Sequence, residues 1–586
     1  MPPGPRFLFA LLPSFITPAA IAYSFLTLFN AYLGGLIPKW FVLLATCLAR
    51  PILSILQRYY TRSVDCKAAA AHNAFIIPHV QEKPLKLAGL SLMKMLVDDF
   101  KAGYPGNQFR KWSLEYGYTY QLRFPSENRI VTFDPEHIKA ILATQFDTFD
   151  KGPVFYKQSQ SLLGTGVFNS DGEMWKFHRS MTRPFFTRDR ISDFDVFEAH
   201  SAHALKLAKA RLEEGHAIDF QDLALRFTLD SATTFLFGHN VDSLSAGPPY
   251  SPTSGMQNSR QFLEHPSNTF VDAFVKAQTQ TALRLRVGPI WPLAEFWEDK
   301  VEKSRKVMDQ YTLPFLKKAL EETEKKNGVD EDEEPETLLS HLARHTQDDK
   351  IIQDELTNLL VAGRDTAGCT LTFAIYMLAE HPKIATRLRQ EVIEVVGATG
   401  RPTYDNLRDM KYMRAFINEV LRLYAPVPFN SRTSHKPAVW TSKGPGSKHY
   451  YIPANTKVLY SVMYLHRRKD LWGPDALEFD PDRFLDERLH KYLTPNPFIF
   501  CPFNAGPRIC LGQQFAYQET SYFLVRLLQQ FSNFRLDPGA QPAWSKPPAD
   551  WAHQGDERAA KEKITPAFHL TLYVKGGLWG RMDEVY

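Results

Sequence analysis

The chain has few cysteines, and their spacing pairs none of them. Its 586 residues contain five, with no C-x-x-C pattern: Cys47, Cys66, Cys369, Cys501 and Cys510. This distribution argues against a disulfide framework or a structural zinc site and suits a reducing compartment. The net charge is only +5, and no Lys/Arg-rich tract is interleaved with aromatic residues. We therefore expect no nucleic-acid partner.

Charged residues are absent from Phe7 to Pro38. About 20 apolar residues suffice to cross the hydrocarbon core of a bilayer. Because Pro13 and Pro18 weaken the first part, we expect the membrane span at residues 19–37, within an anchor region at residues 1–60. The run is too long for a cleaved signal peptide, the competing interpretation, and no small-residue cleavage site stands out.

A second apolar stretch, residues 40–56, is interrupted by Arg50 and Pro51. It predicts an interfacial or re-entrant segment, with a second membrane span as the alternative. Basic residues follow the apolar region, and an excess of Lys and Arg marks the cytoplasmic side. They are Arg50, Arg58, Arg62 and Lys67. We expect a linker at residues 61–84 and a catalytic body, tethered to membrane lipid, that faces the cytosol.

Residues 85–586 predict one mixed domain dominated by helix. Hydrophobic residues make up 44% of the chain and aromatic residues 13%, enough for a large core. Short alternating runs predict a hairpin of Gln121–Phe124 with Ile130–Phe133. Residues 541–563 are polar and predict a surface insertion before a final strand pair, Phe568–Val574 and Leu578–Met582.

The loop Phe503–Gly512 places one cysteine between glycines. Gly506 and Gly512 let the backbone turn tightly and approach a flat partner. Amide groups of the turn, with the start of a helix near Gln513, favour a thiolate at Cys510, which is a metal ligand. Arg508 can donate a forked pair of hydrogen bonds to a carboxylate. The alternative is a structural cysteine buried in a strand-to-helix turn.

This loop resembles the haem-binding loop of the cytochrome P450 family, with Phe503, Gly506, Arg508, Cys510 and Gly512 at the family's spacing. The resemblance implies a mainly α fold with small β-sheets, behind an N-terminal membrane anchor. It also implies haem b as the cofactor, with Cys510 as the axial ligand of its iron. A thiolate ligand donates electron density and favours O–O cleavage.

The predicted helix Ile351–Glu380 carries Ala362-Gly363-Arg364-Asp365-Thr366, which resembles the oxygen-activating helix of the same family. Gly363 costs helix stability, and a Thr side chain can bond a carbonyl of the preceding turn and bend the axis. A bend would open room for oxygen and water. Thr366 would then donate a hydrogen bond at the oxygen site while Asp365 relays protons from solvent. The alternative is an Asp-Thr pair on a polar helix face.

Glu419 and Arg422 lie three residues apart, which puts them on one helix face, and Pro481-Asp482-Arg483-Phe484 follows in the family's order. The resemblance implies that Glu419, Arg422 and Arg483 form a buried network that supports the cysteine loop.

A further match is Trp175-Lys176-Phe177-His178-Arg179. The resemblance implies that Trp175 and Arg179, four residues apart, bind the haem propionates. Arg432 is another candidate propionate partner, with a surface arginine on a strand as the alternative. His178 points elsewhere on the helix and is not a candidate ligand.

The predicted activity is monooxygenation of a hydrophobic small molecule. No Gly-rich strand-turn-helix for a flavin or nicotinamide follows residue 512, so electrons should come from NADPH through a separate NADPH-cytochrome P450 reductase. We expect an endoplasmic reticulum location, with the reductase docking near the cysteine loop. Basic residues close to that loop in sequence could steer an acidic partner. They are Arg467, Arg468, Lys469 and Arg508.

The motif Ala362–Thr366 and the cysteine loop together look most like those of fungal enzymes of the alkane-assimilating type. This resemblance implies long-chain n-alkanes or fatty acids as substrates. The alternative is a xenobiotic or aromatic substrate, such as a polycyclic compound or alkylphenol. A haem-thiolate isomerase or dehydratase usually lacks the acid-alcohol pair, and a non-enzymatic haem protein would not need it. Apolar pocket residues are expected in four places: Phe155–Phe168, Phe270–Phe274, Leu359 and Val427–Phe429.

Overall fold

A computed structural model describes most of the chain. The described residues are 1–82, 89–124, 127–187, 191, 194–326, 337–346, 348–441, 448–553 and 557–585. Side chains at 319 and 322–326 are not described.

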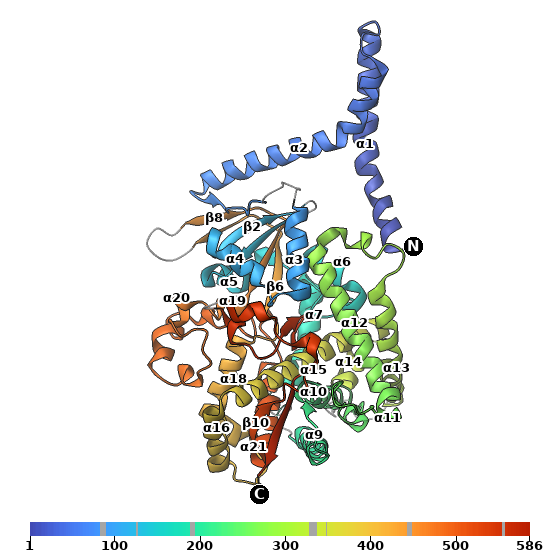
Figure 1. Cartoon of the computed structure of the whole chain (residues 1–586). Coiled ribbons are helices and arrows are strands. Elements are labelled where there is room, and N and C mark those ends of the chain that lie inside the picture. The colour runs from blue at the N-terminus through green and yellow to red at the C-terminus, as the bar shows by residue number, and fades with distance from the viewer. Residues whose placement is uncertain are drawn as a thin grey trace.

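The fold is mainly helical, as predicted, with small sheets: β2, β6 and β8 lie toward the α2 side of the body, and β10 lies at the opposite end, beside α21 (Figure 1). The described helices are α1 (Pro3–Tyr32), α2 (Lys39–Ala71), α3 (Leu90–Ala102), α4 (Asn107–Tyr116), α5 (Pro135–Lys139), α6 (Gly152–Leu163), α7 (Gly172–Thr182), α9 (Asp195–Glu213), α10 (Phe220–Phe237), α11 (Arg260–Glu264), α12 (Pro266–Val287), α13 (Lys300–Lys326), α14 (Leu338–His345), α15 (Asp349–Glu380), α16 (Pro382–Val395), α17 (Tyr404–Asp409), α18 (Lys411–Leu423), α19 (Val462–Leu465), α20 (Lys469–Trp472) and α21 (Gln513–Gln530).

The strands form four small sheets in the described chain. They are β1 (Phe75–Ile76), β2 (Thr119–Arg123), β3 (Asn128–Thr132), β4 (Phe149–Asp150), β5 (Ile218–Asp219), β6 (Phe429–Ser434), β7 (Ala438–Thr441), β8 (His449–Ile452), β9 (Thr456–Ser461), β10 (Phe531–Leu536), β11 (Pro566–Phe568), β12 (Leu572–Val574) and β13 (Trp579–Glu584). The largest sheet has the order β2-β3-β9-β6-β4, and the others are β1-β8-β7, β10-β13-β5 and β11-β12. In the largest sheet β3 runs parallel to β9, which brings Arg129 beside Lys457.

Helix α15 crosses the middle of the body (Figure 1). Asp348 caps its start by accepting hydrogen bonds from the backbone amides of Lys350 and Ile351, and Pro382 follows its end. Most of its residues are buried, and it packs along α10 and α21. A helix buried nearly all round belongs to the core of a large domain. The first half of α15 packs into the core built on α12 and α13, and its second half packs into the core built on α9, α18 and α21.

Two N-terminal helices, α1 and α2, extend beyond the body and pack against each other (Figure 1). Both are long and apolar enough to cross a membrane, by length and composition. Helix α1 starts before the expected span, because it continues through Pro13 and Pro18. Proline is tolerated in helices of this kind, where local adjustments satisfy the freed backbone groups. It ends at Tyr32, just before Gly34 and Gly35, whose φ angles are +67° and +88°.

The second apolar segment forms one continuous helix. Helix α2 passes through Arg50 and Pro51 and ends at Ala71, so the first part of the expected linker is helical. Residues 83–84 of that linker lie outside the described residues. By length and composition α2 satisfies the alternative of a second span.

The predicted hairpin of β2 and β3 is present, with its strands starting two residues earlier than expected. Its turn at residues 125–126 lies outside the described residues. The expected strand Phe568–Val574 is instead two short strands: β11 pairs with β12, while β13 pairs with β10 and β5. The turn bonds at His569 reverse the chain there and break the single strand.

Residues 541–563 are not merely a surface insertion. Arg558 and Glu562 are each 6% exposed. Glu562 accepts hydrogen bonds from the hydroxyls of Tyr424 and Tyr104 at 3.0 Å and 3.2 Å and from Arg558 at 3.2 Å. Arg558 also donates to the carbonyl of Leu477 at 3.0 Å. Polar composition predicted exposure here because the sequence does not reveal that the charges pair with each other and with core hydroxyls.

Replacing Glu562 should therefore destabilise the fold. The change Glu562→Ala leaves the Arg558 guanidinium buried without its carboxylate, and breaking a buried pair costs about 3–5 kcal/mol. We expect a matching fall in the free energy of unfolding, measured by urea titration followed by circular dichroism. The control is Asp550→Ala, an exposed acid of the same segment, which should change it by less than about 0.5 kcal/mol. Equal effects of the two changes would contradict the network.

Candidate functional site

The loop that carries Cys510 is shaped by one glycine. Gly506 has a φ of +67°, and a Cβ built on it would lie 1.9 Å from the carbonyl oxygen of Leu142. A short 3-10 turn, Gly506–Arg508, follows, and the Cys510 amide donates to the carbonyl of Phe503 at 3.0 Å. Helix α21 begins three residues after Cys510, so the start of a helix lies beside the thiol as predicted.

Gly512 does not have the predicted backbone role. Its φ is −81°, and an added Cβ would meet its nearest atom, on Phe186, at an ordinary 3.6 Å. Its amide instead lies close enough to the Cys510 sulfur to favour the thiolate. The enclosing protein raises the pKa of the Cys510 thiol, while the Gly512 amide and the Arg179 cation oppose that rise.

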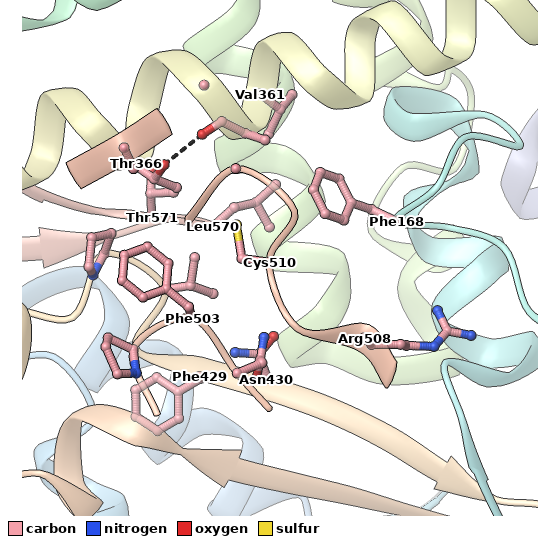
Figure 2. A pocket seen from close by; sticks show the side chains of 18 of the residues that line it. Phe168, Val361, Thr366, Phe429, Asn430, Phe503, Arg508, Cys510, Leu570 and Thr571 are labelled. Carbon is pink, nitrogen blue, oxygen red and sulfur yellow. Dashed lines mark hydrogen bonds between the residues drawn. The ribbon is translucent and has the colours of Figure 1, made fainter. Parts of the chain in front are cut away.

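Cys510 lies in the wall of a cavity of about 440 Å³ that reaches α15. In Figure 2 its sulfur points toward the side of the pocket on which α15 carries Thr366. The Thr366 hydroxyl donates to the carbonyl of Ala362 at 2.6 Å, the bond to the preceding turn that the sequence suggested. Gly363 also lines the cavity. The cysteine and the alcohol therefore share one cavity.

Most of the expected apolar lining is present. Phe155, Phe168, Leu359 and the pair Val427 and Phe429 contribute to the cavity wall. Phe270 and Phe274 do not, because they stack on each other at 5.8 Å in the core between α12 and α13. An amphipathic pattern cannot distinguish core-facing from cavity-facing apolar residues.

Asp365 is turned away from the cavity. Its two carboxylate oxygens accept hydrogen bonds from Arg364 and from Gln278 of α12, both at 2.6 Å, and the residue is 4% exposed. The carboxylate is therefore buried and paired with side chains of α15 and α12. His569 lies near this group and lines the cavity. Burial lowers the pKa of His569 to about 4, so this imidazole is neutral at pH 7.

The expected propionate partners gather along one part of the cavity wall. Trp175, Arg179, Arg432 and Arg508 all line it. Arg179 donates to the carbonyl of Ile509 at 2.7 Å, which ties α7 to the residue before Cys510. Arg508 lies over the Trp175 ring at 4.5 Å and donates to Asp171 at 2.7 Å. Arg432 is 3% exposed, which rules out the alternative of a surface arginine.

Lys151, which sequence reasoning missed, belongs to the same part of the wall. Burial lowers its pKa well below the usual value, and the cations Arg432 and Arg508 lower it further. Burial and Arg432 also lower the pKa of Arg508 to about 10. Asp171 is the one carboxylate that raises the pKa of both groups. Three cations enclosed with so little compensation fit the two carboxylates of a haem. No sequence signal marks Lys151, because a single lysine ahead of a Gly-Pro helix start is common.

The predicted network of Glu419, Arg422 and Arg483 forms, and all three residues are at most 1% exposed. Arg422 pairs with Glu419 at 2.7 Å, and Arg483 lies 3.6 Å from the same carboxylate. Arg422 also donates to the carbonyl of His466 at 2.8 Å. The ring nitrogen of His466 accepts from the amide of Cys501 at 2.9 Å, which connects the network to the start of the cysteine loop. Burial and Arg422 lower the pKa of His466 to about 3, which keeps it a neutral acceptor.

His178, correctly set aside as a ligand, has a partner that the sequence did not reveal. It is fully buried and lies 2.9 Å from the Glu355 carboxylate of α15. Glu355 also accepts from the amide of Val167 at 2.9 Å. The pair therefore connects α7 to α15 behind the cavity.

A mainly helical body with one cysteine facing a Gly-Arg-Asp-Thr helix across an apolar cavity defines a haem-thiolate enzyme. Comparison with known proteins agrees: residues 89–548 match the cytochrome P450 family. Cytochrome P450 monooxygenase pvhE of Talaromyces variabilis is 36% identical over 71% of this chain and 76% of its own length. Cytochrome P450 monooxygenase himC of Aspergillus japonicus is 34% identical over 88% of this chain and 85% of its own length. Cytochrome P450 52A1 of Candida tropicalis is 37% identical over 70% of this chain and 74% of its own length.

The chain belongs to the cytochrome P450 family and is a monooxygenase of that family. The predicted resemblance to fungal members of the family is confirmed, since the relatives compared above are fungal.

The two glycines of the cysteine loop should respond differently to alanine. Gly506→Ala places a Cβ against the Leu142 carbonyl and forces a residue with a side chain into the left-handed region, which alone costs about 1–2 kcal/mol. We expect a lower thermal unfolding midpoint for the haem-free protein, measured by differential scanning fluorimetry. Gly512→Ala lies in the same loop, but its φ is ordinary and the added Cβ would make only van der Waals contacts, so the midpoint should stay close to that of the wild type. A midpoint unchanged in both variants would contradict this account of the loop.

Proposed function

We propose that this monooxygenase hydroxylates long-chain aliphatic substrates, n-alkanes or fatty acids, with dioxygen and electrons from a separate reductase. The observation that carries the proposal is the shared cavity of Cys510 and Thr366, whose exposed wall is mainly apolar. The motif resemblance to alkane-assimilating fungal enzymes supports the aliphatic class.

The residues around the cavity fit haem b. The Cys510 thiolate would hold the iron, in a loop that Phe503, Gly506 and the Gly512 amide help to shape. The propionates would be bound by the cationic side chains and the indole described above, namely Lys151, Trp175, Arg179, Arg432 and Arg508. Bound haem supplies redox-active iron with an electron-rich thiolate ligand, which favours O–O cleavage.

Thr366 and Asp365 would handle protons. Thr366 projects its hydroxyl at the cavity edge, where it can reorient from the Ala362 carbonyl to donate a hydrogen bond. Asp365 is held beside it by Arg364 and Gln278, so protons would reach it along the α12–α15 contact rather than directly from solvent. A short chain of this kind excludes bulk water while it delivers protons.

Electrons would come from NADPH through NADPH-cytochrome P450 reductase. The residues first expected to dock it need revision, because Arg467 is only 7% exposed and the side chain of Arg508 only 6%. Arg467 donates to the carbonyl of Leu423 and to Tyr104, and Arg508 to Asp171. Buried and paired guanidinium groups cannot steer a partner. Arg468 fails the same test, because its side chain is 11% exposed and pairs with Asp470. Lys469, which is exposed, is the residue of the original set that remains for that role.

We further propose that residues 1–60 anchor the protein in the endoplasmic reticulum membrane, with the catalytic body, residues 85–586, in the cytosol. Two apolar helices support the anchor. The basic residues of α2 that follow the apolar region support the cytosolic orientation.

A substrate panel, applied to the wild type and to a Cys510 variant, tests both the proposed reaction and the role of Cys510 as the ligand of the haem iron. Full-length protein with reductase and NADPH is expected to oxidise an alkane or a fatty acid, with the product position read by mass spectrometry. Cys510→Ser should abolish both turnover and the red-shifted Soret band of the ferrous–carbon monoxide complex. Cys66→Ser, an exposed cysteine on α2, should retain both. If no alkane, fatty acid or aromatic compound is oxidised, the proposed function fails; oxidation of aromatics alone would favour the alternative substrate class.

Thr366→Val tests the proton path, because it removes the hydroxyl at nearly constant volume. Since a positioned acid contributes about 10²–10⁴-fold, product formation should fall by roughly 10²-fold while NADPH is still consumed. Thr372→Val is the matched control: Thr372 lies on the same helix, makes the same 2.6 Å bond to a carbonyl four residues back and does not line the cavity. The ratio of product to NADPH is the measurement, and an unchanged ratio in Thr366→Val would exclude Thr366 from the path.

A further inference from the structure

The cavity contains a second group of cations, distinct from the one assigned to the propionates. Lys457 of β9, Arg129 of β3 and Arg286 in the last turn of α12 all line it. The charges that act on Lys457 are those of Arg129 and Glu127, whereas those that act on Lys151 are Arg432, Arg508 and Asp171. Arg129 acts on both Lys457 and Arg286, so these three cations form one group, which we call the Arg129 end of the cavity.

Lys457 is buried without a counter-charge of its own. It is 8% exposed, and its ammonium has no hydrogen-bond partner among the described residues. Burial, together with Arg129, lowers the pKa of Lys457 to about 8. An unpaired buried ammonium is costly, and a desolvated lysine that lines a cavity is typical of a site that receives an anion.

Arg286 closes this end of the cavity between two aromatic rings. Its guanidinium lies 3.8 Å from the Phe100 ring and 4.4 Å from the Phe568 ring, so α12, α3 and β11 meet here. One terminal nitrogen donates to the carbonyl of Ala282, and the other has no partner among the described residues. Burial lowers the pKa of Arg286 to about 9. The rings fix the guanidinium in place and leave one donor face for a ligand.

The local charges do not balance. Arg129 pairs with Glu127, and its Nη2 donates to the carbonyl of Arg286 at 3.1 Å. Asp99 is the other acidic group at this end, and burial raises its pKa to about 6. Three cations thus face two carboxylates, which leaves one positive charge that a single anion would neutralise.

We propose that Lys457 and Arg286 form a subsite for the carboxylate of an amphipathic substrate, so that the enzyme selects fatty acids over n-alkanes. This rests on the proposed monooxygenase function and narrows its substrate class. The apolar wall between this end and Thr366, which includes Phe429 and Phe568, suits the hydrocarbon chain. A carboxylate held by two cations would leave the rest of the chain free to extend toward Cys510.

Equilibrium binding tests the subsite without any turnover. Full-length haem-loaded protein in detergent micelles is titrated by isothermal calorimetry at pH 7 with dodecanoate, its uncharged methyl ester and dodecane. Because a charge-assisted hydrogen bond contributes strongly, we expect dodecanoate to bind about tenfold more tightly than the ester. Lys457→Met should remove that preference, and Lys457→Arg should keep it. Lys276→Met, an exposed lysine on the same helix as Arg286, should have no effect.

Equal affinity of the wild type for dodecanoate and its methyl ester would overturn the subsite. So would an equal loss of affinity for both ligands in Lys457→Met, which would indicate packing alone, or a loss of haem in that variant, which would assign Lys457 to the haem site. Should Lys457→Met not fold, Arg286→Gln supplies the same comparison. A carboxylate preference in an enzyme that oxidises nothing would leave the subsite standing and remove the proposed function.

Discussion

The close approach of Gly506 to the Leu142 carbonyl is the constraint on which the rest of the site depends. It sets the turn that places Cys510 in the cavity wall. Side chains from other elements hold the loop from other sides: Arg179 donates to the Ile509 carbonyl, and His466 accepts from the Cys501 amide. The buried network of Glu419 supports the loop indirectly, because Arg422 donates a hydrogen bond to the carbonyl of His466. The Cys510 thiol is thus positioned by contacts that are made to the backbone of its loop and of the residues just before it.

The buried charges of this protein are of two kinds, those paired inside the body and those that face the cavity without a full counter-charge. Glu562 and Glu419 balance arginines inside the body, where pairing decides stability. Lys151 and Lys457 are enclosed but poorly balanced, and both face the same cavity. Cavity walls that retain unbalanced cations store electrostatic free energy that only a bound anion can release. Ligand binding and stability are therefore expected to be coupled in this fold.

The sequence was sufficient wherever spacing alone carries the chemistry. The turn at Gly506, the bond of Thr366 to its preceding turn and the Glu419–Arg422 pair follow from local geometry, and the structure has each of them. It was insufficient where partners come from distant segments. Asp365 turns toward Gln278, 87 residues earlier in the chain. Glu562 and Arg558 are buried beside Tyr424, and Glu562 also beside Tyr104. Lys457 and Arg286 come from distant segments and line one cavity only in the folded chain, so no sequence motif could predict the pair.

Helix α1 contacts the body at the turn that follows Arg286, one of the cations proposed to bind the substrate carboxylate. The Gly4 amide donates to the carbonyl of Phe296, ten residues beyond Arg286, and Gly4 itself is buried there. If α1 lies in a bilayer, the Arg129 end of the cavity is held close to the lipid surface. Substrate would then be drawn from the lipid phase, and its effective concentration would be set by partitioning rather than by the amount dissolved in water. An apparent KM would accordingly scale with the lipid or detergent volume in the assay, and comparisons between preparations need that volume held constant.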